Sequence, residues 1–286
     1  MTENEIHVDK TLATPGVAKP LKLAVPLLAL IILLAWLALT PGGLLGKADA
    51  VGYAVCHRIA SHSFFFGDRQ LPLCARCSGM HLGALLALTY QVRLGKRGGM
   101  PSKKLLVVLG VFLLAFAVDG VNSYLTLGQE SGSSISLFAN FQPLYIPMNW
   151  LRALTGIMMG SGIGAVLYPI FNQTMYKEWD PRPSLSSWRD LFQLLGLSIL
   201  LEAALLSNNV FFLYPLAILS SLTVLLILSM IYAIVWAMIM KQENVFSSLQ
   251  QSWMILLLGF TTAVLQIGIM DYGRFMLTGT WNGFGL

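Results

Sequence analysis

Long apolar runs, separated by short polar or glycine-rich stretches, dominate this chain of 286 residues. A helix that crosses a membrane needs about 20 mostly apolar residues, and the runs approach or reach that length. They cover residues 23–39, 78–92, 105–127, 148–171, 191–206, 214–240 and 252–270. We therefore expect an all-α fold, a polytopic transmembrane helical bundle of about seven helices.

The composition supports a membrane protein and argues against a soluble one. Hydrophobic residues make up 56% of the chain and charged residues 11%, whereas a soluble domain carries about 25% charged residues. The net charge of +5 does not indicate nucleic-acid binding, because the basic residues sit mainly at helix ends, where membrane orientation explains them. We expect membrane lipids as partners and no nucleic acid.

Basic residues also predict the orientation. Lys and Arg are concentrated at residues 93–104, which places that loop in the cytoplasm. Alternation of the spans then assigns the other segments. A cytoplasmic polar tail at 1–22 and the loops at 172–190 and 241–250 fall inside, and the loops at 41–78 and 128–147 fall outside. These features predict a multi-pass protein of the plasma membrane.

The chain divides into a tail at 1–22, a core of four transmembrane helices at 23–171 and three further helices at 172–286. The first apolar run, 23–39, has a second reading as a signal peptide, because Ala48-Asp49-Ala50 resembles a cleavage site. A retained helix is favoured, since the run is long for a signal peptide and the site lies well beyond its end.

One polar loop collects most of the candidate ligands. Residues 56–83 contain all three cysteines and three of the four histidines. Cys74 and Cys77 are close enough for both sulfurs to reach one ion or each other, and they precede a predicted helix whose N-terminus stabilises a thiolate. Cys56 and His57 would complete a Cys₃His set, which suits Zn²⁺. His62 and His81 are alternative fourth ligands.

The same cysteines leave two other readings open. Cys74 and Cys77 would be the active pair of a thiol-disulfide oxidoreductase linked to a membrane quinone, with Cys56 as the resolving thiol. Alternatively, the cysteines form a structural disulfide or stay as inert thiols.

Ionisable residues inside the apolar runs predict a polar cluster. In the expected topology Asp119, Asn149, Arg152 and Glu202 lie at the same membrane depth as the cysteine loop, and such residues are costly unless paired or functional. Asp119 with Arg152 would be a structural ion pair or a catalytic pair, with Asn149 beside it. Arg76 and Arg152 would hold an anionic head group.

Glycines and tryptophans indicate packing. The Gly79 and Gly83 spacing, and the glycines between 156 and 164, predict close helix contact. Four tryptophans near helix ends are typical of an aromatic belt: Trp150, Trp188, Trp253 and Trp281.

These motifs resemble a family of membrane proteins catalogued as domain of unknown function 2085. The resemblance covers about residues 50–165 and rests on CHR at 56–58, LPLCARCSG at 71–79, DG at 119–120 and RALTG at 152–156. In the family pattern an aromatic residue stands where His81 does and an arginine where His62 does. The resemblance therefore favours Cys56, His57, Cys74 and Cys77 as ligands, but it implies no reaction.

The leading hypothesis is an outward-facing zinc site beside an Asp/Arg pocket at the outer leaflet, acting on a lipid-like substrate. There the metal would activate water or polarise a carbonyl or phosphoryl group. The alternatives are the quinone-linked oxidoreductase and a non-enzymatic subunit of a larger membrane complex, with membrane protein partners. The sequence leaves open whether the chain is an enzyme.

Overall fold

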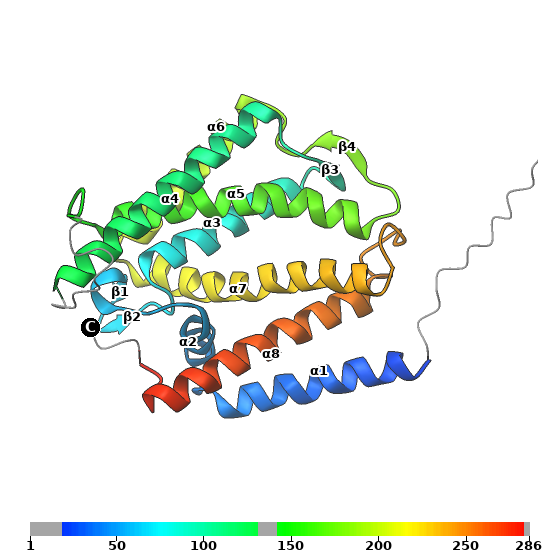
Figure 1. The fold of residues 1–286 in the computed structure, drawn as a ribbon, viewed down its shortest axis with the longest axis horizontal. Helices are drawn as coiled ribbons and strands as arrows, with labels where there is room; N and C mark the ends of the chain where they lie inside the picture. The colour runs from blue at the N-terminus through cyan, green and yellow to red at the C-terminus, as the bar shows by residue number, and fades with distance from the viewer. Residues whose placement is uncertain (1–18, 131–141, 283–286) are drawn as a thin grey trace, which may run out of the picture.

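The structure, a computed structural model, describes residues 19–130 and 142–282. Residues 1–18 of the expected tail and 131–141 of the expected 128–147 loop lie outside that part. The described residues form eight α-helices and two small two-stranded sheets, which confirms the all-α membrane bundle (Figure 1). The helices are α1 (Lys19–Leu39), α2 (Leu44–Val55), α3 (Ala75–Val92), α4 (Lys103–Glu130), α5 (Asn149–Met175), α6 (Trp188–Leu206), α7 (Val210–Ile239) and α8 (Trp253–Thr278).

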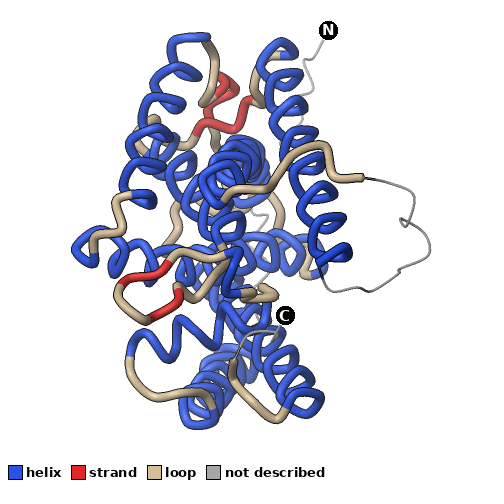
Figure 2. Tube along the Cα trace, turned by 90° about the vertical axis from the view of Figure 1, so that its left-hand side faces the viewer, coloured by secondary structure: helices blue, strands red, loops and turns tan. Residues whose placement is uncertain are grey.

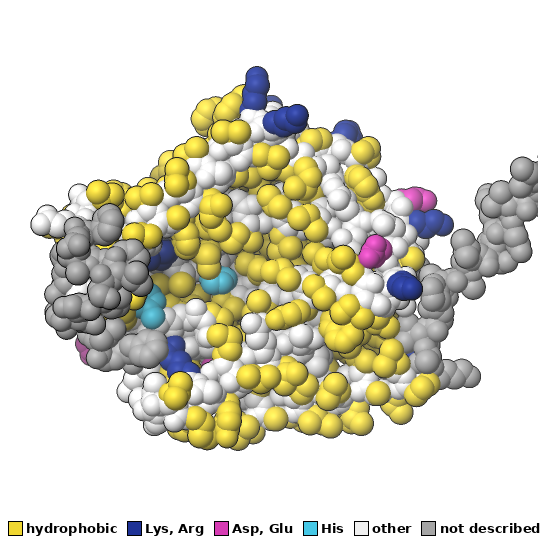
Figure 3. All heavy atoms as spheres, viewed as in Figure 1, with side chains coloured by type: hydrophobic (Ala, Val, Ile, Leu, Met, Phe, Trp, Pro, Cys, Tyr) yellow, Lys and Arg dark blue, Asp and Glu magenta, His cyan; other side chains and the backbone are white. Residues whose placement is uncertain are grey.

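Five of the described helices, α1, α4, α5, α7 and α8, are long and apolar enough to cross a membrane. Their outward faces carry large apolar side chains such as Leu27, Val107 and Leu222, each more than half exposed. Figure 3 shows the same pattern, with hydrophobic side chains over the helices and Lys and Arg gathered towards the ends. Exposed apolar surface on this scale marks a lipid-facing protein. The other two expected spans are present as the shorter helices α3 and α6.

The loops gather at two ends of the bundle. Strand β3 (Arg97–Gly99) pairs in parallel with β4 (Asp180–Pro183), and Tyr176 forms a bridge with Phe246. At the opposite end, β1 (Phe65–Phe66) and β2 (Arg69–Gln70) form a small hairpin, and Figure 2 views the molecule from that end. The loops at 93–104, 172–190 and 241–250, which alternation assigned to one side of the membrane, thus lie together. Which side of the membrane this end faces stays a prediction.

Helices α3 and α5 form the most extensive helix pair in the bundle. A Cβ atom added at Gly83 would collide with the backbone carbonyl of Ile157, and one at Gly160 would collide with that of Met80. Both glycines therefore let the two backbones meet directly. The predicted close contact is confirmed, and it fixes the first turn of α3 against α5.

Helix α2 was not predicted: residues 44–55 were expected to be loop. Its composition of small residues explains the difference, since the segment is too short to span a membrane yet can bury itself against other helices. Gly52 lets α2 approach the backbone carbonyl of Pro72, and α2 packs on α7 and α8. The C-terminal end of α2 therefore places Cys56 beside the start of α3.

The tryptophans lie where an aromatic belt requires them. Trp150 is the second residue of α5, Trp188 begins α6 and Trp253 begins α8. All three are substantially exposed. Trp281 follows the end of α8, so all four lie near helix ends as predicted.

Candidate functional site

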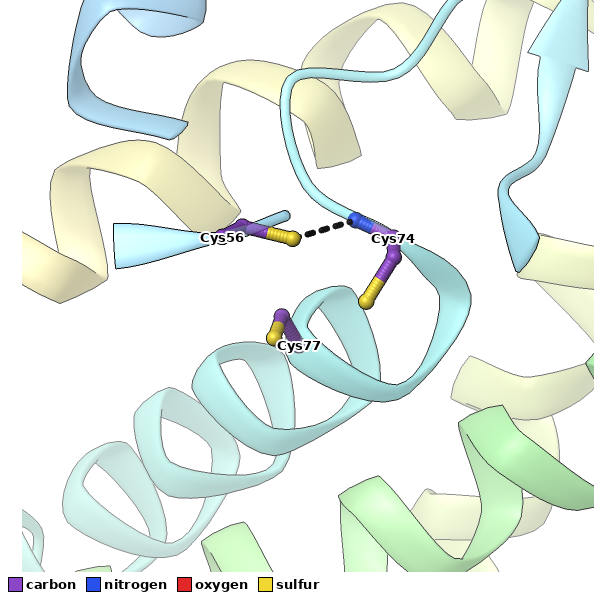
Figure 4. A group of neighbouring side chains, drawn as sticks. All are labelled: Cys56, Cys74 and Cys77. Carbon is purple, nitrogen blue, oxygen red and sulfur yellow. Dashed lines mark hydrogen bonds between the residues drawn. The ribbon is translucent and has the colours of Figure 1, made fainter. Parts of the chain in front are cut away.

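The three cysteines converge at the junction of α2 and α3. Cys56 directly follows α2, Cys74 is the N-cap residue of α3, and Cys77 lies in its first turn. Their sulfur atoms all lie within 4.8 Å of one another, and all three thiols are free. Figure 4 shows the three side chains grouped around the start of α3. Cys56 and Cys74 are buried and Cys77 is half-buried.

Hydrogen bonding places the first negative charge of the cluster on Cys56. The backbone N–H of Cys74 donates to the Cys56 sulfur at 3.3 Å (Figure 4). Hydrogen bonds from the Cys74 and Cys77 thiols lower the pKa of Cys56 well below its ordinary value. The same contact with Cys56, followed by burial, raises the pKa of Cys74 to about 12. These contacts therefore favour the thiolate of Cys56 over that of Cys74, and cation binding would release protons from the cluster.

The histidines surround the cluster without belonging to it. His57 Nδ1 lies 3.8 Å from the Cys56 sulfur, and its Nε2 lies 3.4 Å from Nδ1 of His62. His57 is therefore the histidine next to the sulfurs, but it is not part of the group within 4.8 Å. His81 Nδ1 contacts the Cys77 carbonyl at 2.8 Å; the carbonyl can only accept, so Nδ1 carries the proton and Nε2 keeps its lone pair.

Helix α8 fixes the segment that carries Cys56. Arg274 Nη1 donates to the carbonyls of Tyr53 at 2.5 Å and Cys56 at 2.6 Å, and Nη2 donates to that of His57 at 3.3 Å. Arg58 forms an ion pair with Asp49 of α2 at 3.0 Å. The turn after α2 is therefore held by two arginines.

A second polar cluster adjoins the cysteines through Arg76. Asp119 of α4 is 1% exposed, and its Oδ2 accepts hydrogen bonds from Arg76 Nε at 3.0 Å and from Arg76 Nη2. Its Oδ1 accepts the hydroxyl of Tyr145 at 2.9 Å. Burial and this bond to Asp119 raise the pKa of Tyr145 to about 12. Arg76 is therefore an ion-pair partner of Asp119, a contact that the sequence did not predict.

Arg152 belongs to the same network as Asp119. Ser123 Oγ accepts from Arg76 Nη2 at 2.7 Å and from Arg152 Nε at 3.3 Å, and Arg152 Nη1 donates to Asn149 Oδ1 at 2.8 Å. Asn149 Nδ2 in turn donates to the carbonyls of Ser61 at 3.1 Å and Ser63 at 3.3 Å. Arg76, in the first turn of α3, reaches across to Asp119 on α4.

The structure thus brings Asp119, Asn149 and Arg152 together in one polar cluster and adds Arg76 to it. Glu202 stays apart: it is buried in α6, and neither of its carboxylate oxygens has a hydrogen-bond partner among the described residues.

Sequence reasoning did not find Ser123, Tyr145 or Arg274 as parts of the site. Ser123 follows Asp119 by four residues, so helical spacing gave a signal for a shared face. Tyr145 lies in a loop, and Arg274 is more than 200 residues from Cys56. No local pattern marks these two contacts.

The comparisons with known proteins cover the part of the chain that contains this site. Residues 56–166 match the family described as predicted membrane protein (DUF2085), and the matched range contains the cysteine cluster and the Asp119 network. The uncharacterized protein MJ1492 of Methanocaldococcus jannaschii is 26% identical over 132 residues, which are 46% of this chain and 72% of that protein. No solved structure matches significantly. The resemblance to the DUF2085 membrane protein family is therefore confirmed over residues 56–166.

Proposed function

We propose that this chain is a membrane protein that binds Zn²⁺ on Cys56, Cys74 and Cys77. The observation that carries the proposal is the convergence of three free sulfurs within 4.8 Å at a helix N-terminus. The N–H bond from Cys74 to the Cys56 sulfur adds a backbone donor of the kind that stabilises thiolates. Three sulfur ligands suit Zn²⁺ because it accepts soft donors in a tetrahedral arrangement.

Three protein ligands leave a fourth position. His57, with its Nδ1 3.8 Å from the Cys56 sulfur, is the candidate for that position. If His57 binds, the site is closed and structural; if water binds, the site can activate that water or polarise a carbonyl or phosphoryl group.

We further propose that the adjoining polar cluster binds the head group of a lipid-like, anionic substrate. Arg152 is buried beside His62, and burial, followed by the charge of Arg152, lowers the pKa of His62 to about 4. The positive potential that disfavours protonation there would attract an anion. Arg152 and Arg76 both belong to this cluster, and they are the candidates for the head-group contact.

Cadmium substitution tests the metal proposal independently of activity. Cd²⁺ bound by thiolates gives an ultraviolet charge-transfer band, so titration of purified protein should produce that band at one ion per chain. Cys56→Ser, Cys74→Ser and Cys77→Ser should each weaken it. A titration without the band in folded protein would contradict the proposal. The pocket proposal fails separately if folded Asp119→Asn and Arg152→Ala proteins keep every cellular activity of the wild type.

We propose, as the sequence predicts, that the cysteine end faces outward across the plasma membrane. A reporter that is active only in the cytoplasm, fused within residues 93–104, should be active. An inactive reporter there, with an active one in the 56–74 loop, would reverse the orientation.

Thiol-disulfide exchange is the second candidate. Three mutually adjacent free thiols favour it, whereas the burial of Cys56 and Cys74 opposes it, since exchange needs an accessible sulfur. A quinone-linked oxidoreductase should form trappable mixed disulfides when Cys77 is replaced by Ser; their absence would remove this candidate. A metal site without any catalytic role would instead fit a structural subunit of a membrane complex.

A further inference from the structure

A cavity outside the cysteine site lies between α1 and α8. Its volume is about 560 Å³, and side chains from both helices line it together with Trp281 beyond the end of α8. The lining is almost wholly apolar and includes the aromatic rings of Trp36, Phe275 and Trp281. A volume of a few hundred cubic ångströms is typical of sites that hold one small molecule or part of a lipid.

One charged residue lines this apolar cavity. Asp271 is 2% exposed, and its Oδ2 accepts the indole N–H of Trp36 at 3.0 Å. Its Oδ1 is buried and has no hydrogen-bond partner in the described part of the chain. A buried acceptor without a donor is costly, so this oxygen indicates a missing ligand with a hydrogen-bond donor.

Arg274, one turn further along α8, does not supply that donor. Its charge attracts Asp271, but its Nη1 and Nη2 atoms donate to the backbone carbonyls around Cys56. No donor to Oδ1 is therefore found among the described residues, and a ligand in the cavity with an N–H group would supply one.

The position along the helices identifies the part of the membrane concerned. Asp271 precedes the last residue of α8, Thr278, by seven positions, which is about 10 Å along a helix. Trp36 lies three positions before the end of α1. Both residues are therefore close to the depth of lipid head groups, in the leaflet at the cysteine end.

We propose that this cavity binds a phospholipid with an ethanolamine-type head group. The ammonium donates a hydrogen bond to Asp271 Oδ1, the neighbouring aromatic rings face the cation, and an acyl chain lies against the apolar surface of α1 and α8. The charge of Asp271 favours an ammonium over an anionic head group. This inference does not depend on a metal at the cysteines.

Native mass spectrometry of the full chain tests the site. Delipidated protein in detergent is mixed with equal amounts of dioleoyl phosphatidylethanolamine and dioleoyl phosphatidylcholine, which carry the same net charge but differ in N–H donors. Wild type should retain the ethanolamine lipid about tenfold over the choline lipid, the effect expected of one charge-assisted hydrogen bond. Asp271→Asn should abolish that preference, because Trp36 takes the amide oxygen and an NH₂ group then faces the cavity.

Glu202→Gln is the matched control, since Glu202 is another buried carboxylate without a hydrogen-bond partner and does not line the cavity; it should keep the preference. If Asp271→Asn does not fold, the Gly268→Leu variant tests the binding site instead. Gly268 lines the cavity, and a Cβ there meets only Trp36 Cδ1 at 3.6 Å, so a leucine fills the space and should reduce retention of both lipids. The proposal is overturned if the wild-type protein shows no preference for the ethanolamine lipid, or if folded Asp271→Asn keeps that preference. It is also overturned if dioleoyl phosphatidylglycerol displaces the ethanolamine lipid, or if folded Gly268→Leu retains both lipids as the wild type does.

Discussion

Arg76 and Asp119 join the cysteine motif to the membrane bundle. Arg76 lies between Cys74 and Cys77 in the sequence, and its Nε donates to Oδ2 of buried Asp119 on α4 at 3.0 Å. Every described hydrogen bond to Asp119 comes from a neighbouring element, so its charge is satisfied by protein groups alone. The pair therefore positions the first turn of α3, and with it two of the three sulfurs.

Asp119→Asn should destabilise the protein by about 3–5 kcal/mol, because removing one partner of a buried ion pair leaves the other charge unpaired. Thermal unfolding followed by fluorescence in detergent measures the loss. Asp180→Asn is the control, since Asp180 pairs with exposed Arg182 at the other end of the molecule, and it should change the midpoint little. Equal midpoints for the two variants would contradict a supporting role for Asp119.

Gly160→Ala should separate α3 from α5. The added Cβ would collide with the backbone carbonyl of Met80, and a backbone atom cannot move aside cheaply, so we expect a loss of about 1–3 kcal/mol. At Gly162 a Cβ meets only Leu109 side-chain atoms at 4.0 Å, and Gly162→Ala should be tolerated. Denaturation of both variants side by side checks this, and equal stability would contradict the close contact.

The sequence predicted the helices and the two ends of the bundle well, because apolar runs and basic loops report directly on the membrane. It missed α2, whose small residues resemble a loop and whose burial depends on α7 and α8. It also placed Asp119, Arg152 and Arg76 at one end but did not identify Arg76 as an ion-pair partner of Asp119. Helix periodicity does not reveal which of two arginines on facing helices is in reach; that depends on the rotation of α3 against α4.

Acidification should weaken the fold through His62. Burial and the nearby charge of Arg152 lower the pKa of His62 from 6.5 to about 4. The unfolded chain therefore binds a proton more readily than the folded one, and stability falls as the pH drops from about 6.5 towards 4. Unfolding midpoints across this range should show the decline, and His62→Gln should flatten it. An unchanged slope in that variant would assign the decline to other groups.

Arg274 should control metal affinity without touching the metal. Its bonds to the carbonyls of Tyr53, Cys56 and His57 orient the Cys56 ligand, and supporting contacts of this kind change metal affinity by about 10–100-fold. Arg274→Lys, which keeps the charge but loses the planar group of donors, should weaken zinc binding by about tenfold or more in a competition titration with a chelator. Arg182→Lys serves as the control. Identical zinc affinities for both variants would mean that Arg274 does not support the metal site.

Zinc content is the most direct test of the central claim. The detergent-purified protein is analysed for metals while its thiols are counted under denaturing, non-reducing conditions. We predict about one zinc per chain, three free thiols, and loss of the zinc in Cys74→Ser. A metal-free protein with a single reactive thiol would contradict the account, because it would mean that two of the three cysteines are joined in a disulfide.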